Sequence, residues 1–521
     1  MKNSLCLQAC LLICLVCTNR SKVFTTIVDL EDLLETEALL IDTLDDYIKA
    51  HEKKLDFLKR YSKIYKNHYN EVSKNDQLYL ENPVNAYIFF KRLMIDWEKV
   101  ENLVANNHEL EWWPRIKNIR EIKKFPTNKD LNGAIVALTH LQDTYRLDTS
   151  SLARGKLNGV KYSSELSAAD CFDLGIHFYK IADYYHTQLW MREADARLER
   201  EANETVNRSD ILEYWAFSTY KQGDVSLALD VTNKLLEIQP THHRALGNKL
   251  QYEYMLQKEG EKDDVEIETE MESDSYNGEI YTQLCRGEIS LSMEKASKLK
   301  CFYLSGNNHF LKIAPFKVEE AHHKPDIIIF HDVLANSEIA TIKRMALPKF
   351  KPAVFKNSNT SELEILPYRI CKVAWLQDEE HKHISDVSQR VSDMTGLTMS
   401  TAEKLQVVSY GIGGHYEPHY DFSKSYFTDD DRTATVLFYM SDVKQGGATV
   451  FPNVQVSVWP KKGSAALWYN LHPSGDGDNM TLHGACPVLY GSKWISTKWI
   501  HYRGQEFLRP CTLEKSSEEF Y

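Results

Sequence analysis

The residues best suited to chemistry are His419 and Asp421, which lie two positions apart in the segment Gly413 to Asp421 (GGHYEPHYD). On an extended strand, side chains two positions apart point to the same face, so both can bind one metal ion. A second imidazole from a later strand would complete two histidines and one carboxylate, which leaves open positions on Fe(II). His483, in the sequence LHGACP, is the leading candidate. The H-x-D pair alone is weak evidence for a metal site, because a chain with 19 histidines should contain roughly one such pair by chance.

Lys493 supplies context that the short motif lacks. It follows His483 by ten residues, in the sequence GSKW, at the predicted start of a strand. A lysine ammonium is a compact point charge, and beside an iron site it suits the distal end of a dicarboxylate cosubstrate. In isolation the plainer interpretation would be a surface lysine. The combination favours an Fe(II) oxygenase with a dicarboxylic acid as cosubstrate.

Short strand-like runs surround these residues from about position 325 onward. Turn sequences such as Gly446-Gly447 separate several of them. Many short strands at such spacing predict a sandwich, barrel or jelly roll. The runs are 327–330, 405–410, 433–440, 448–451, 454–459, 465–471 and 494–501.

Between about 145 and 250 the sequence predicts helical repeats. Ala216, Gly223, Ala228 and Pro240 fall at the spacing of one tetratricopeptide unit. Aromatics at helical spacing usually pack a core, but a groove lined with tyrosines would also suit a polyproline II peptide. The groove candidates are Tyr184, Tyr185, Trp190, Tyr214, Phe217 and Tyr220.

The N-terminal region predicts a long helix with one apolar stripe. The stripe continues for about three heptads, with His51 on the seam. A helix inside a larger bundle and a dimer-forming coiled coil both fit this pattern. The stripe positions are Ile41, Leu44, Ile48, Leu55, Leu58 and Tyr65.

The first 20 residues predict a signal peptide. Lys2 precedes an apolar run from Leu5 to Val16, and polar residues follow. This run is shorter than the roughly 20 residues that a membrane-spanning helix needs. We therefore expect a secreted-pathway chain with no membrane span after cleavage.

An oxidising compartment would allow disulfides among the cysteines that follow the signal peptide. Cys285 with Cys301 and Cys486 with Cys511 are the favoured pairs, because each pair is close in sequence within one domain, although sequence cannot fix connectivity. Cys171 and Cys371 would then be free. Glycosylation sequons begin at Asn203, Asn207, Asn359 and Asn479.

The whole chain of 521 residues is too long for one hydrophobic core. Its formal net charge of −12 gives no basic field to attract nucleic acid. Eight acidic residues within 261–274 predict a solvated linker. The expected division is a signal peptide at 1–20, a helical dimerisation domain at 21–144, a TPR-like peptide-binding domain at 145–255, a linker at 256–324 and a catalytic domain at 325–521.

Several longer motifs resemble the collagen prolyl 4-hydroxylase alpha subunit. In the C-terminal part they are LQVVSYGIGGHYEPHYD from Leu405, GGATVFP from Gly446, HGACPVL from His483 and KWIHYRGQEF from Lys498. In the helical part they are DYYHTQLWM from Asp183 and the repeat ending at Pro240. The resemblance covers nearly the whole chain, and its motifs occur in the same order.

The resemblance implies an α+β multidomain fold, with a helical N-terminal coiled-coil region, a TPR-like domain and a C-terminal double-stranded β-helix. It implies that His419, Asp421 and His483 bind Fe(II), and that Lys493 and Tyr410 bind the C5 carboxylate of 2-oxoglutarate. His501 would handle the C1 carboxylate. The reaction would be 4-hydroxylation of proline in X-Pro-Gly repeats, with O2 as the other cosubstrate, succinate and CO2 as products, and L-ascorbate restoring oxidised iron.

The same resemblance implies an alpha-2-beta-2 tetramer with protein disulfide isomerase, procollagen-like peptide substrates and the lumen of the endoplasmic reticulum. The sequence departs from the family by His415 and Tyr420, where we expect Gln and Phe, and by Phe217, where a groove Tyr is usual. The alternatives are the same chemistry on a non-collagen proline-rich secretory protein, and a catalytically silent collagen-binding subunit.

Overall fold

The computed structural model describes residues 51–70, 81–105, 128–201, 205–259, 273–305, 309–356, 363–365, 368–423 and 430–512, and positions 41, 45, 48, 49 and 73. The predicted signal peptide, most of the acidic linker, Leu44 and the sequons at Asn203 and Asn359 lie outside these residues. The chain divides into two compact units. The first contains residues 1–74 and 99–115, and the second contains residues 75–98 and 116–521. No helix among the described residues is long and apolar enough to cross a membrane.

The first unit contains the N-terminal helical region. Residues 51–70 are helical. The stripe residues Ile41, Ile48 and Leu55 are each about half exposed. Because these three apolar side chains stay half exposed, the described part of the unit does not cover them.

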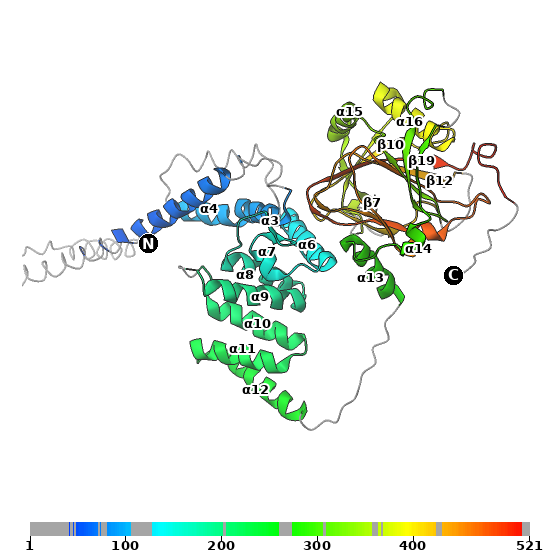
Figure 1. The fold of residues 1–521 in the computed structure, drawn as a ribbon. Coiled ribbons are helices and arrows are strands. Elements are labelled where there is room, and N and C mark those ends of the chain that lie inside the picture. Colours follow the sequence, from blue (N-terminus) through cyan, green and yellow to red (C-terminus); the bar gives the residue numbers. More distant parts are fainter. Residues whose placement is uncertain are drawn as a thin grey trace, which may run out of the picture. The chain divides into compact units, whose positions relative to one another are not determined.

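The helical part of the second unit is a stack of successive helices (Figure 1). Polar caps begin several of them: Asp183, Asn207 and Asp224 each accept a backbone N–H of the following turn. The helices of this part are α3 (Pro83–Lys91), α6 (Asn128–Tyr145), α7 (Thr149–Ala153), α8 (Ala168–Lys180), α9 (Tyr184–Leu198), α10 (Arg208–Lys221), α11 (Val225–Ile238) and α12 (His243–Glu259), with a π-helical turn η1 (Arg92–Asp96) after α3. Helix α4 (Trp97–Ala105) follows η1, and its residues from position 99 onward belong to the first unit. A small hairpin, β1 (Lys156–Leu157) and β2 (Val160–Lys161), follows α7.

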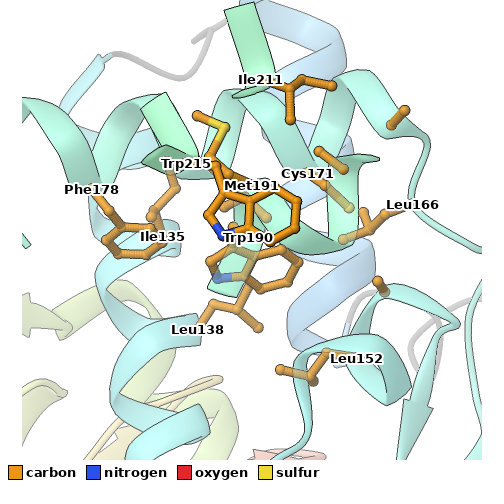
Figure 2. Packing of buried hydrophobic residues seen from close by; sticks show 14 of the residues in the cluster. Ile135, Leu138, Leu152, Leu166, Cys171, Phe178, Trp190, Met191, Ile211 and Trp215 are labelled. Carbon is orange, nitrogen blue, oxygen red and sulfur yellow. The ribbon is translucent and has the colours of Figure 1, made fainter. Parts of the chain in front are cut away.

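A continuous apolar core joins α3 and the helices from α6 to α12, and Figure 2 shows the part of it between Ile135 and Trp215. Trp190 and Met191 of α9 lie at its centre and are almost fully buried. Gly175 lets α8 and α9 approach closely, because an added Cβ there would come within 2.7 Å of the Met191 side chain. This packing fixes which aromatic rings remain on the outside of the stack.

The C-terminal part of the second unit is built on a nine-stranded antiparallel sheet in the order β3-β4-β5-β16-β12-β19-β10-β9-β6. Its strands are β3 (Cys301–Leu304), β4 (Phe316–His322), β5 (Ile327–His331), β6 (Lys351–Pro352), β9 (Lys372–Leu376), β10 (Leu405–Tyr410), β12 (Arg432–Tyr439), β16 (Ala465–Tyr469) and β19 (Lys493–His501). Helices α15 (Asn336–Ala346) and α16 (Lys382–Thr395) pack on one face of it (Figure 1).

A four-stranded sheet covers the other face, through a second core that includes Phe451 and Trp468. The two sheets make the jelly-roll type of fold that the strand pattern predicts. The smaller sheet contains β11 (Tyr416–His419), β17 (His483–Ala485), β14 (Thr449–Phe451) and β15 (Val456–Val458). Two further pairs are β13 (Gln445–Gly446) with β18 (Val488–Tyr490) and β7 (Val354–Lys356) with β8 (Leu363–Ile365). Short 3₁₀ turns are η2 (Leu347–Lys349), η3 (Asp378–Glu380), η4 (Pro452–Val454) and η5 (Asn479–Thr481).

The expected linker at 256–324 differs from the structure. Helices α13 (Ser273–Arg286) and α14 (Met293–Ala296) lie within this range, and β3 and β4 already belong to the large sheet. The acidic run at 261–274 indicated where the expected linker begins. It did not predict α13, α14, β3 or β4.

The expected disulfides are wrong. Cys285 at the end of α13 pairs with Cys486, with a Cα–Cα distance of 5.5 Å, while Cys301 and Cys511 are exposed free thiols. The physical reason is packing: α13 lies against β14 and β15, so Cys285 meets Cys486 in one small apolar cluster. Proximity in sequence was a poor guide because the packing of a helix against the small sheet brings together residues 201 positions apart. Cys171 and Cys371 are free, as expected.

Candidate active site

His419, Asp421 and His483 form one cluster at the end of the β11–β17 strand pair. His419 ends β11, His483 begins β17, and the two residues are paired in the antiparallel register. His419 Nε2 lies 3.7 Å from Asp421 Oδ1, and His483 Nε2 lies 3.6 Å from Asp421 Oδ2. One ligand atom from each residue lies within 4.8 Å of the others. The arrangement can hold a metal ion by three ligands on one side, as two imidazoles and one carboxylate do in non-haem Fe(II) sites.

Backbone carbonyls orient both imidazoles. The Glu417 carbonyl is 2.8 Å from His419 Nδ1, and the Thr481 carbonyl is 3.0 Å from His483 Nδ1. With its Nδ1–H donated to a carbonyl, each ring presents Nε2 as a free acceptor. Burial lowers the pKa of His419 well below its usual range, so the ring is neutral and able to bind a metal near pH 7.

Asp421 is held by two donors on a single oxygen. Trp499 Nε1 donates to Oδ2 at 2.9 Å and Thr435 Oγ1 donates to it at 2.7 Å. Burial works against ionisation, but the neighbouring His483 and His419 rings and these two hydrogen bonds give a net lowering of the pKa of Asp421. The carboxylate is therefore ionised, with Oδ1 left for a metal.

An aromatic column supports His419. The Tyr416 ring stacks on the imidazole with 3.5 Å between centroids, and the Arg369 guanidinium lies over the Tyr416 ring, 4.6 Å from its centroid. Arg369 also donates to Gln406 Oε1 at 3.0 Å, while its buried Nε has no hydrogen-bond partner among the described residues. The side chains of Arg369 and Gln406 both line the pocket that contains the metal cluster. Sequence reasoning missed Arg369, because it lies on a short segment about 50 residues before the motif.

Lys493 lies at the inner end of the same pocket and is 1% exposed. Burial lowers its pKa to about 7. Its ammonium lies 3.4 Å from Thr449 Oγ1 and pairs with no carboxylate among the described residues. An unpaired buried cation is costly, so this group is suited to an anionic ligand.

Tyr410 lies directly opposite Lys493 in the β10–β19 ladder. The Lys493 ammonium is 5.5 Å from the Tyr410 ring centroid, and the buried Tyr439 hydroxyl donates to Thr449 Oγ1 at 2.9 Å. Burial raises the pKa of Tyr410, which keeps its hydroxyl protonated as a donor. A ligand with one carboxylate here and a second at the metal cluster fits the pocket chemically.

His501 does not lie with these residues. It ends β19, its Nε2 is 3.3 Å from Glu403 Oε1, and it is absent from the pocket lining among the described residues. Glu403 also binds Arg432, whose guanidinium stacks on Trp499 at 3.9 Å. His501 is thus linked to the metal site through Glu403, Arg432 and Trp499 rather than by direct contact.

The aromatic residues of α8 to α12 divide into a series of surface rings and a core. The surface series is continuous: Tyr179 contacts Tyr214 at 4.8 Å between centroids and Phe217 at 5.8 Å, Tyr184 contacts Phe217 at 5.9 Å, and Tyr220 contacts Phe217 at 6.4 Å. The buried Tyr252 lies behind Tyr220, at 4.9 Å between centroids, and belongs to the core. Tyr179 was not among the predicted groove residues; the helical repeat spacing could have indicated it.

The prediction that Trp190 binds peptide is wrong. Trp190 is 1% exposed and packs at the centre of the helical core (Figure 2). It follows Tyr184 by six residues, which places it roughly 240° around α9, away from the tyrosine face. Tyr185 is 53% exposed and contacts His186 rather than the ring series.

Comparisons with known proteins match three family models to separate parts of the chain. Residues 26–159 match a family described as the N-terminal region of the prolyl 4-hydroxylase alpha subunit, residues 168–258 match the prolyl 4-hydroxylase peptide-substrate-binding domain, and residues 405–501 match the 2OG-Fe(II) oxygenase superfamily.

Two relatives are similar over almost the full chain. Prolyl 4-hydroxylase subunit alpha-1 of Homo sapiens is 44% identical over 515 residues, covering 94% of this chain and 96% of the relative. Prolyl 4-hydroxylase subunit alpha-2 of Caenorhabditis elegans is 43% identical over 527 residues, covering 98% of each. Among solved structures, the viral collagen prolyl hydroxylase of Paramecium Bursaria Chlorella virus-1 is 23% identical with a TM-score of 0.28, covering 33% of this chain and 94% of that one.

Proposed function

Because this chain belongs to the prolyl 4-hydroxylase alpha-subunit family, we propose that it 4-hydroxylates proline in X-Pro-Gly repeats of collagen-like chains. The chain is an Fe(II)- and 2-oxoglutarate-dependent dioxygenase that hydroxylates proline. The observation that supports the finer proposal most is the continuous series of partly exposed aromatic rings from Tyr179 through Phe217 to Tyr220. Lys493, which pairs with no carboxylate among the described residues and lies in the same pocket as the His-Asp-His cluster, supports the cosubstrate.

His419, Asp421 and His483 would hold Fe(II) through Nε2, Oδ1 and Nε2. When bound, the metal supplies the oxidising chemistry that couples decarboxylation of 2-oxoglutarate to succinate and CO2 with insertion of an oxygen atom from O2 into the proline C4–H bond. The protein's share of the reaction is orientation. Trp499 and Thr435 hold the carboxylate, and the Glu417 and Thr481 carbonyls hold the imidazoles.

Lys493 and Tyr410 would bind the C5 carboxylate of 2-oxoglutarate. The ammonium supplies the charge, the tyrosine hydroxyl supplies a donor, and the buried surroundings strengthen both interactions. The C1 end of the cosubstrate would then lie at the metal cluster. The role of His501 at the C1 carboxylate stays a prediction; we assign it an indirect route, through Glu403, Arg432 and Trp499.

The peptide would bind to the surface series of Tyr184, Tyr214, Phe217 and Tyr220. Proline-rich peptides in the polyproline II conformation are rigid and have little entropy to lose, and their rings stack on aromatic faces. Phe217 has no hydroxyl, so the peptide backbone loses one hydrogen-bonding partner at the centre of the series. Tyr185 remains a candidate at its edge because it is exposed.

We extend the proposal to the assembly. The chain would act as the alpha subunit of an alpha-2-beta-2 tetramer with protein disulfide isomerase, in the lumen of the endoplasmic reticulum, with ascorbate restoring iron after uncoupled turnover. The half-exposed stripe at Ile41, Ile48 and Leu55 supports a partner for the N-terminal helix. The predicted signal peptide at 1–20 supports the compartment. The domain division, apart from the linker at 256–324 that the structure corrects, remains part of the same proposal.

The test is a coupled assay on the chain coexpressed with protein disulfide isomerase. (Pro-Pro-Gly)n peptide, Fe(II), ascorbate and 1-¹⁴C-labelled 2-oxoglutarate are supplied, and released CO2 and hydroxyproline are both measured. We expect equal amounts of the two products, and neither from Asp421→Ala. CO2 release with only a non-collagen proline-rich peptide would favour the alternative substrate. Peptide binding without either product would favour the silent subunit.

A further inference from the structure

The turn before His483 is tied to the segment that bears the other two metal ligands. Two side chains donate to the same backbone carbonyl, that of Asn479 in η5: Asn453 Nδ2 at 2.7 Å and the Tyr420 hydroxyl at 3.2 Å. Tyr420 stands between His419 and Asp421 in sequence. Asn453 lies in η4, directly after β14.

A second contact reinforces this tie. The Phe422 ring lies so close to Gly477 that an added Cβ at position 477 would overlap it. Tyr420 and Phe422, the two neighbours of Asp421, also contact each other at 5.0 Å between ring centroids. In the segment 419–422, His419 and Asp421 therefore point to the metal cluster, while Tyr420 and Phe422 contact the turn at 477–479.

A short series of bonds leads from this carbonyl to the third ligand. In η5 the Thr481 hydroxyl donates to the Asp478 carbonyl at 2.7 Å, which fixes the turn. The Thr481 carbonyl then orients His483 through Nδ1 at 3.0 Å. Movement of Asn479 would be transmitted within four residues to the His483 ring.

We propose that Tyr420 is a positioning residue for the metal site, which acts with Asn453 to clamp the Asn479 carbonyl and so fixes His483 relative to His419 and Asp421. A phenylalanine at position 420, as expected in relatives, keeps the ring contact with Phe422 but not the bond. The inference rests on the proposed metal-binding role of the three ligands and adds a residue that touches neither metal nor cosubstrate.

The test compares Tyr420→Phe with Tyr303→Phe, a change of the same atoms at a 71% exposed site on β3. Fe(II) affinity is measured by anaerobic equilibrium dialysis of the full chain coexpressed with the disulfide isomerase. The ligand-field absorption of bound Co(II) reports the coordination geometry. Loss of one net hydrogen bond corresponds to about a twofold to tenfold weaker Fe(II) affinity for Tyr420→Phe, with an altered Co(II) spectrum and an unchanged KM for 2-oxoglutarate at saturating iron.

Asn453→Ala provides the second variant and should act in the same direction. The proposal is overturned if Tyr420→Phe and Asn453→Ala bind Fe(II) like the wild type, or if Tyr303→Phe loses as much affinity as Tyr420→Phe. Metal binding is measured without peptide. Failure of the wild-type chain to hydroxylate (Pro-Pro-Gly)n would therefore reject the proposed substrate and leave the clamp to be judged on its own data.

Discussion

Tyr410 and Lys493 face each other across the β10–β19 ladder, and this pairing places a buried ammonium 5.5 Å from the tyrosine ring at the inner end of the metal pocket. A cation that is 1% exposed and has no acidic partner among the described residues is an unusual element of a folded core. This placement supports the proposed role of Lys493 in binding the distal carboxylate of the cosubstrate. That role makes two predictions.

Lys493→Ala should weaken 2-oxoglutarate binding steeply while leaving the metal ligands in place. Charge-assisted hydrogen bonds are worth about 1.5–3 kcal/mol, so the KM for 2-oxoglutarate should rise about tenfold to a hundredfold. Steady-state CO2 release over a wide range of 2-oxoglutarate measures this, and Fe(II) dialysis should give the wild-type affinity. Lys461→Ala, at an exposed site, is the matched control. A collapse of iron binding in Lys493→Ala would contradict our assignment of this lysine.

The same lysine predicts a pH dependence. Burial lowers its pKa to about 7 in the free protein, whereas a bound carboxylate stabilises the charged form and raises the pKa. Cosubstrate affinity should therefore be constant below about pH 7 and fall by up to tenfold per unit above it, until the pKa of the complex is reached. Titration calorimetry between pH 6.5 and 9 at saturating metal measures the slope.

Lys493→Arg provides the control for that slope, because a guanidinium stays charged throughout this range. The variant should bind 2-oxoglutarate with an affinity that does not change over the same pH interval. An equally steep fall in Lys493→Arg would assign the titration to another group.

Much of the site follows from sequence, for reasons that are local. The two-residue spacing of His419 and Asp421 brought both to one cluster, and the strand at 405–410 has the predicted bounds. The residues that support the site, such as Arg369, Thr435 and Trp499, were not predicted. Thr435 and Trp499 lie on β12 and β19, which are neighbours in the large sheet, and Arg369 forms an isolated bridge with Tyr416. Pairing between such distant segments has no local signal.

The errors have the same origin. Cys285 and Cys486 are joined by the packing of α13 against the small sheet, not by sequence distance. β11 and β17, four and three residues long, were not among the predicted strand runs, although the metal motif assumed an extended backbone at both. Burial also separated Trp190 from the tyrosines around it, which composition alone could not do.

Trp499→Phe should loosen Asp421. The substitution keeps a large ring against Arg432 but removes the Nε1–H that donates to Oδ2 at 2.9 Å. Partners of metal ligands typically change metal affinity by about 10–100-fold; with Thr435 still donating, we expect the lower end of that range. Anaerobic Fe(II) dialysis measures the loss. Trp459→Phe, at a residue that is 49% exposed, should leave the affinity unchanged.

The Cys285–Cys486 disulfide should be found by peptide mapping under non-reducing conditions, with Cys301 and Cys511 both open to alkylation. Because the bond closes a long loop, Cys285→Ala should lower the free energy of unfolding by about 2–5 kcal/mol. Thermal denaturation followed by circular dichroism measures this, and Cys301→Ser should have the stability of the wild type. A cross-linked peptide joining Cys285 to Cys301 would refute the pairing.

Tyr214 and Trp190 separate the two roles of aromatic residues in the helical stack. Tyr214 contacts Tyr179 and Phe172 at the edge of the surface series, so Tyr214→Ala should weaken binding of a (Pro-Pro-Gly)n peptide by about threefold to tenfold, the worth of one aromatic contact. Because the ring is only partly buried against the core, the loss of stability should be smaller than for Trp190→Ala. Trp190→Ala opens a cavity at the centre of the core and should cost about 3–5 kcal/mol of stability. Calorimetric peptide titration and thermal melts of both variants make the comparison. If Trp190→Ala stays fully stable and loses only peptide affinity, the core position assigned to this ring is wrong, and the groove must extend to the opposite face of α9.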